Sequence, residues 1–127
     1  MTFLIYSLII AALLPYLAKG PVAYAMHKLG GYDNKHPRSQ QAKLTGFGAR
    51  ALAAHQNAFE SFMIFAAAIL LAITTQHIGE NIQQLAAIYL AARVIYNFLY
   101  LANIGALRSL SWFISLGCSL SIMILCL

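Results

Sequence analysis

The residues of this sequence with the clearest chemical potential are charged and amide side chains inside otherwise apolar segments. In the helical stretch that begins near Thr45, Arg50, Asn57 and Glu60 fall within an arc of about 80° at 100° per residue. Gln56 lies about 40° further round the same helix. Because placing such groups in an apolar helix is energetically costly, this shared face indicates a functional site.

A second polar stripe lies in the next long apolar stretch. Its members fall within about 100° of one another on a helix: Tyr89, Arg93, Tyr96, Asn97 and Tyr100. Tyrosines are common where helices cross the membrane boundary, and this would explain Tyr89 or Tyr100. It does not explain Arg93 in mid-span, so the stripe is a second candidate for function.

The two faces are expected to meet at one level of the structure. The start of the second span, the end of the third and the start of the fourth, which carries Arg108 and Ser109, all lie on the same side of a four-span bundle. One interpretation is an ion-pair network of Arg50 and Arg93 with Glu60 that holds the bundle together. The remaining surplus of cationic and amide donors favours a polar, anionic ligand.

The elements that must position these groups are membrane helices. The sequence is 61% hydrophobic and only 9% charged, whereas soluble domains are roughly a quarter charged. At about 20 residues per crossing, the chain can span a bilayer four times as one domain, residues 1–127. We predict an all-α, integral membrane four-helix bundle, with a kink near Pro15. The predicted spans cover residues of about 2–27, 45–75, 82–103 and 109–127.

The distribution of charge predicts the orientation and excludes nucleic acid as a partner. Nearly all lysines and arginines lie in the loops after spans one and three, so the positive-inside rule places those loops in the cytoplasm and both termini outside. The net charge of +5 forms no basic stripe interleaved with aromatic residues, which a nucleic-acid binder would need. No metal site is predicted, because no pair of the four histidines has close ligand spacing.

The polar residues carry a resemblance to a known family. The string from Arg50 to Glu60, Arg-Ala-Leu-Ala-Ala-His-Gln-Asn-Ala-Phe-Glu, is followed by Arg93-x-x-Tyr96-x-x-x-Tyr100 and then by Arg-Ser at 108–109. This pattern resembles the MAPEG superfamily, the membrane-associated proteins in eicosanoid and glutathione metabolism. The loop Asp-Asn-Lys-x-Pro-Arg at 33–38 is similar to that of a bacterial branch of the superfamily, which suggests a bacterial inner membrane.

The resemblance implies a homotrimer that binds glutathione at each subunit interface, near the cytoplasmic side. It implies that Arg108 activates the thiol, with the hydroxyl of Ser109 beside it, so that the thiolate attacks a lipophilic electrophile. The enzyme would be a glutathione transferase or peroxidase. The ligand-binding or ligand-adjacent positions are then Arg50, Gln56, Asn57, Glu60, Arg93, Tyr96 and Tyr100.

Two departures from the family pattern keep an alternative open. Ala53 stands where the eicosanoid-forming members have an additional arginine, and Gln56 replaces a basic residue of some relatives. Lys28, Lys43 and Arg38 in the loop are the candidates to replace that charge. The alternative is a noncatalytic membrane interaction or lipid-binding protein that keeps the fold. A transporter is disfavoured, because the polar residues stop halfway across the membrane.

Overall fold

The computed structural model describes all residues from 1 to 127, and its regular structure is entirely helical. Four stretches are long and apolar enough to cross a membrane, and α1 and α2 together form the first of them, Thr2–His27. The helices are α1 (Thr2–Leu17), α2 (Lys19–His27), α3 (Pro37–Gln41), α4 (Gly46–Thr74), α5 (Glu80–Leu101) and α6 (Gly105–Ile124).

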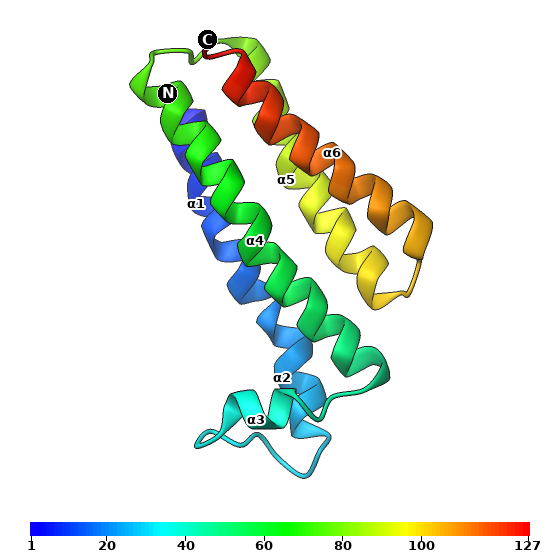
Figure 1. The fold of residues 1–127 in the computed structure, drawn as a ribbon. Coiled ribbons are helices and arrows are strands. Elements are labelled where there is room, and N and C mark those ends of the chain that lie inside the picture. The colour runs from blue at the N-terminus through cyan, green and yellow to red at the C-terminus, as the bar shows by residue number, and fades with distance from the viewer.

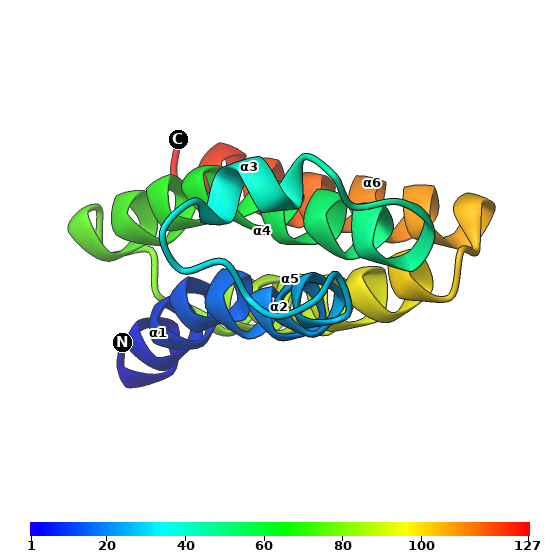
Figure 2. The same cartoon turned by 90° about the horizontal axis from the view of Figure 1, so that it is seen from below.

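The four spans form an antiparallel bundle in two layers. Figure 1 shows both termini and the α4–α5 connection at one end, and the loop that carries α3 at the other. Seen from below, α4 and α6 lie in one layer and α1, α2 and α5 in the other (Figure 2). The core between them includes Leu4, Phe65, Tyr89 and Ile122, and the rings of Phe65 and Tyr89 stack with centroids 3.8 Å apart.

Most large apolar side chains point away from this core. Leu17, Met63, Phe98 and Phe113, for example, are 64–70% exposed. The buried positions of α4 include six small residues: Gly48, Ala51, Ala54, Ala58, Ala68 and Ala72. This pattern is typical of membrane bundles, in which small residues permit close helix packing while apolar side chains face lipid.

The first span is interrupted at Ala18, three residues after Pro15, in agreement with the kink predicted there. Proline has no backbone N–H and disturbs the hydrogen bonding of a helix interior. The carbonyl oxygen of Pro15 lies 2.7 Å from Nδ1 of His55 on α4. His55 therefore makes a contact between helices.

A small second core joins α2 to the start of α4. Val22, Met26 and Ala51 are buried there together. Gly48 permits this approach, because a Cβ added at that position would lie 3.0 Å from Cβ of Ala25 and 2.9 Å from Cδ2 of Leu44. The cationic loop between the first two spans is thus packed against the end of the bundle.

The fourth helix begins four residues earlier than predicted. Asn103 has a positive φ of 61° and Ile104 is extended, so the chain reverses direction quickly and α6 starts at Gly105. The backbone N–H of Arg108 donates to the carbonyl of Ile104 at 3.2 Å. The predicted start of the fourth span near Ser109 was therefore too late, and Arg108 lies in the first turn of α6.

Candidate functional site

The centre of the polar cluster is Arg93, which is only 4% exposed. Its Nη2 donates to Oδ1 of Asn57 on α4 at 2.7 Å, and its Nη1 lies 3.5 Å from Oγ of Ser115 on α6. The guanidinium carbon lies 4.1 Å from the centre of the Tyr96 ring. Arg93 therefore ties three spans together at one level, as the convergence of the two polar faces predicted.

Glu60 joins this cluster through Asn57 and not through an arginine. Nδ2 of Asn57 donates to Oε2 of Glu60 at 3.3 Å, while Oδ1 of Asn57 accepts from Arg93. The single ion pair of the chain is in the loop, between His36 and Asp33. The interpretation as an ion-pair network of arginines with Glu60 is therefore wrong, and the Asn57 amide is the bridge.

Aromatic rings connect the cluster to the start of α6. The rings of Tyr96 and Tyr100 meet edge to face with centroids 5.7 Å apart. The guanidinium carbon of Arg108 lies 4.4 Å from the centre of the Tyr100 ring, and this contact orients a cation by attraction to the ring face. A series of contacts thus runs from Arg93 over both tyrosines to Arg108.

A cavity of about 210 Å³ opens between these groups. The residues that line it come from α4, α5 and α6: Asn57, Tyr96, Tyr100, Arg108, Ser109, Trp112 and Phe113. Five of the nine predicted site residues are among them. Since Arg108 is half-buried and has no carboxylate partner, its charge is available to an anion.

A second cavity of about 170 Å³ shares Asn57 and Trp112 with the first. It also receives Glu60, Ser61 and Ser115, and Oγ of Ser61 lies 2.9 Å from the hydroxyl of Tyr89. Trp112, Ser61 and Ser115 were missed by sequence reasoning. The signal that could have found the α6 face is the spacing of its buried serines, Ser111, Ser115 and Ser119, four residues apart.

Two predicted site residues lie elsewhere. Nη2 of Arg50 donates to the carbonyl oxygen of Leu101 at 3.4 Å, and its buried Nε has no hydrogen-bond partner. The guanidinium thus covers the carboxyl end of α5, where backbone carbonyls lack helical partners. Gln56 lines a different, larger cavity, beside His55 and Phe59, and does not reach the cavities at Asn57.

One sequence comparison decides the family. A model described as the MAPEG family matches residues 3–127, nearly the whole chain. The chain belongs to the MAPEG family. The search of the curated proteins and the search of the solved structures gave no match.

Family membership fixes the broad class of this MAPEG protein. The family comprises membrane glutathione transferases and peroxidases and eicosanoid enzymes, and its members commonly use glutathione. With its four apolar helices, this MAPEG protein is an integral membrane protein, which confirms the predicted class of all-α membrane bundle.

The polar side chains of this MAPEG protein fit a polar ligand with both signs of charge. Arg108 supplies a cation, Ser109 and Tyr100 supply hydroxyl groups, and Glu60 supplies a carboxylate in the adjoining cavity. Glutathione carries a thiol, two carboxylates and an amino group, and each has a complementary partner in this set. The residues present therefore suit glutathione chemically.

Proposed function

We propose that this MAPEG protein is a glutathione-dependent transferase or peroxidase that acts on lipophilic electrophiles. The observation that carries the proposal is the single cavity in which Arg108 and Ser109 of α6 face Asn57 of α4 and the tyrosine pair of α5. It brings a cation, hydroxyl groups and an amide to one position at the end of a membrane bundle.

Arg108 is proposed to activate the thiol. A free thiol is mostly protonated at neutral pH, whereas the thiolate is the nucleophile. A guanidinium near the start of a helix favours the thiolate by its own charge and by the partial positive charge of the helix terminus. Tyr100 holds the guanidinium in place from one side, and the Ser109 hydroxyl can donate to the developing anion.

The apolar part of the cavity suits the second substrate. Trp112 and Phe113 are exposed on α6, at the lipid-facing surface of the bundle, so an electrophile can approach from the bilayer. In the transferase reaction a sulfur–carbon bond forms while the leaving group departs with its bonding electrons, and the thiol proton passes to water. In the peroxidase reaction two thiols reduce a hydroperoxide to an alcohol and water and become a disulfide.

The test of the function is a pair of measurements on the detergent-solubilised protein. We expect conjugation of glutathione to an electrophilic aromatic halide, or reduction of a lipid hydroperoxide by glutathione, at a rate above that without protein. Calorimetry should detect glutathione binding at millimolar concentration. If calorimetry shows no binding in that range, the transferase proposal is wrong and a noncatalytic role is favoured.

The proposed enzyme is a homotrimer with glutathione between subunits, oriented with the site toward the cytoplasm of a bacterial inner membrane. The two cavities at Asn57 hold about 210 and 170 Å³, whereas ligand pockets are usually about 300–1,000 Å³, so a second copy would complete the enclosure. We expect light scattering, corrected for detergent, to give three times the chain mass of 13.9 kDa. A monomer would contradict the trimer.

A noncatalytic lipid-binding protein is the second candidate. It is favoured by Ala53 and Gln56, since the first carries no charge and the second faces away from the cavity at Arg108. The same calorimetric measurement separates the two candidates.

A further inference from the structure

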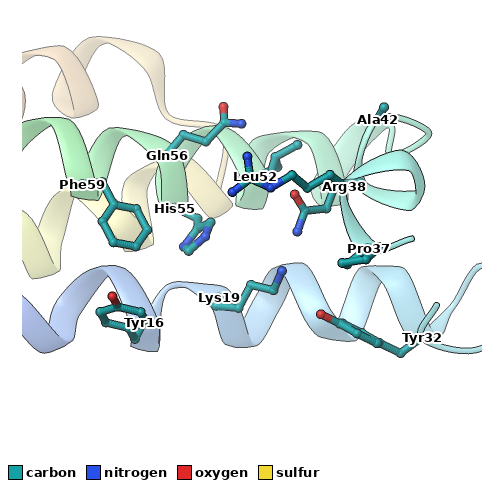
Figure 3. A pocket seen from close by; sticks show the side chains of 11 residues that line it. Tyr16, Lys19, Tyr32, Pro37, Arg38, Ala42, Leu52, His55, Gln56 and Phe59 are labelled. Carbon is teal, nitrogen blue, oxygen red and sulfur yellow. The ribbon is translucent and has the colours of Figure 1, made fainter. Parts of the chain in front are cut away.

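The largest cavity of the chain is not the one at Arg108. A space of about 660 Å³ lies between the first span, α3 and the beginning of α4 (Figure 3). It uses Leu52, His55, Gln56 and Phe59 of α4, a different face of that helix from the one that carries Asn57 and Glu60. None of the residues that line the cavity at Arg108 reaches it.

Its lining is cationic. Lys19 at the start of α2 and Arg38 of α3 enter it from two separate elements, with His55 between them and the apolar end, and no aspartate or glutamate is among the lining residues. Neither Lys19 nor Arg38 forms an ion pair. Figure 3 shows Lys19 directed from α2 toward α4, and Arg38 extending from α3 along α4 beside Leu52. Two cations therefore line one cavity that receives no carboxylate from the protein.

The one carboxylate of the loop between the first two spans, that of Asp33, bonds to the backbone. Oδ1 of Asp33 accepts hydrogen bonds from the N–H groups of Lys35 and His36, both at 3.0 Å, and Oδ2 lies 3.7 Å from Nδ1 of His36. Asp33 thus stabilises the loop backbone and does not pair with Lys19 or Arg38. An anion for these two cations has to come from outside the chain.

The wall that presents Arg38 is fixed by a buried glutamine. Nε2 of Gln40 donates to the carbonyls of Gly31 at 2.7 Å and Met26 at 3.2 Å, while its Oε1 accepts from the N–H of Asp33 at 2.9 Å. These three bonds hold α3 against the end of α2. On the other side, the contact of His55 with Pro15 fixes the first span to α4. The helices that carry the two cations are therefore held in place on either side of the cavity.

The position of the cavity along the first span favours an amphiphilic ligand, one with a charged end and an apolar end. Lys19 is the first charged side chain of the first span and follows the apolar run from Thr2 to Ala18, and such a cation favours a position near the lipid headgroups. One turn deeper, the rings of Tyr16 and Phe59 meet edge to face with centroids 5.4 Å apart and line the apolar end. A ligand that fills the space must be anionic at the loop end and apolar at the membrane end.

We propose that this cavity binds the phosphate headgroup of an anionic membrane lipid. Lys19 and Arg38 contact the phosphate oxygens, and Tyr16 and Phe59 pack against the glycerol and the upper part of an acyl chain. Basic pockets between membrane helices on the cytoplasmic side are suited to such headgroups, and interfacial aromatic rings to the adjoining region. The site is independent of thiol chemistry, so its test uses no glutathione in the primary measurement.

The experiment is native mass spectrometry of the full chain, extracted from vesicles of equimolar phosphatidylglycerol and phosphatidylcholine with identical acyl chains. The wild type is expected to retain phosphatidylglycerol preferentially. In the double variant K19Q/R38Q the retention should fall roughly fivefold for each cation removed, about twenty-five-fold in total. The matched control K35Q/K43Q removes the same number of charges from the segment between the first two spans, outside the cavity, and should keep the preference.

Three results would overturn the proposal. An equal loss in K35Q/K43Q would show that only general surface charge attracts the lipid. Competition by glycerol phosphate at the same concentration as the lipid would identify a site for free phosphate. Displacement of the lipid by millimolar glutathione would assign the cavity to the thiol site. The variant K19R/R38K preserves both charges, and retention of the preference there supports the proposal even if K19Q/R38Q fails to fold.

Discussion

Replacing Arg108 by alanine is expected to lower the rate of glutathione conjugation about a hundredfold, the scale of effect that follows loss of one donor to a developing anion. The guanidinium is the single cation that lines the cavity shared by α4, α5 and α6, so no neighbouring group replaces its charge. The measurement is kcat and kcat/KM of R108A with a soluble aromatic halide, followed as a function of pH. The rate of the variant should recover at high pH, where the thiol ionises unaided.

The conservative variant R108K separates charge from folding. A lysine keeps the positive charge but loses the planar contact with the Tyr100 ring, so we expect its rate to lie between those of R108A and the wild type. An R108A rate within twofold of the wild-type rate, with no change in its pH dependence, would show that Arg108 does not activate the thiol.

Replacing Asn57 by leucine is expected to lower the free energy of unfolding by about 2 kcal/mol. Asn57 is the closest hydrogen-bond partner of Arg93, and its loss leaves a buried guanidinium with only the longer contact to Ser115 and the Tyr96 ring. Hydrogen bonds between neutral groups in membrane bundles average about 0.6 kcal/mol, but a bond to a charged group is stronger. Reversible unfolding in mixed micelles measures the change.

Two further variants test the cause of that loss. Asn97→Leu changes the same residue type on α5, where the side chain lines an apolar groove and makes no hydrogen bond, so its effect should stay within about 0.5 kcal/mol. The double variant N57L/R93M removes both partners and should be more stable than N57L alone, since no buried charge is left unpaired. A double variant less stable than N57L would contradict this explanation.

Helix periodicity was sufficient to predict the cluster at Arg93. The angular positions of Asn57 and Glu60 on one helix and of Arg93, Tyr96 and Tyr100 on the next identified the two faces that meet. Because consecutive spans run in opposite directions, these faces were also predicted to lie at the level where α6 begins. These predictions needed no tertiary knowledge, because both the periodicity and the direction of each span can be obtained from the sequence.

The remaining differences arise from contacts that periodicity does not describe. Arg50 lies on the predicted polar face, yet its guanidinium covers the carbonyl of Leu101, since the carboxyl end of α5 is within its reach. Gln56 is adjacent to Asn57 in sequence, but one residue turns the helix by about 100°, so Gln56 lines the large cavity beside His55 and not the cavities at Asn57. The role of Asn57 as a bridge between Arg93 and Glu60 depends on distances between side chains, which no residue pattern contains.

Trp112 forms part of the wall of both cavities at Asn57, and it is the single tryptophan of the chain. Its indole emission therefore originates beside Arg108 and Ser115 and nowhere else in the protein. Occupancy of either cavity can be followed by fluorescence without turnover, in the native sequence and without an added dye. Ligands of the two cavities can therefore be screened before any reaction is measured.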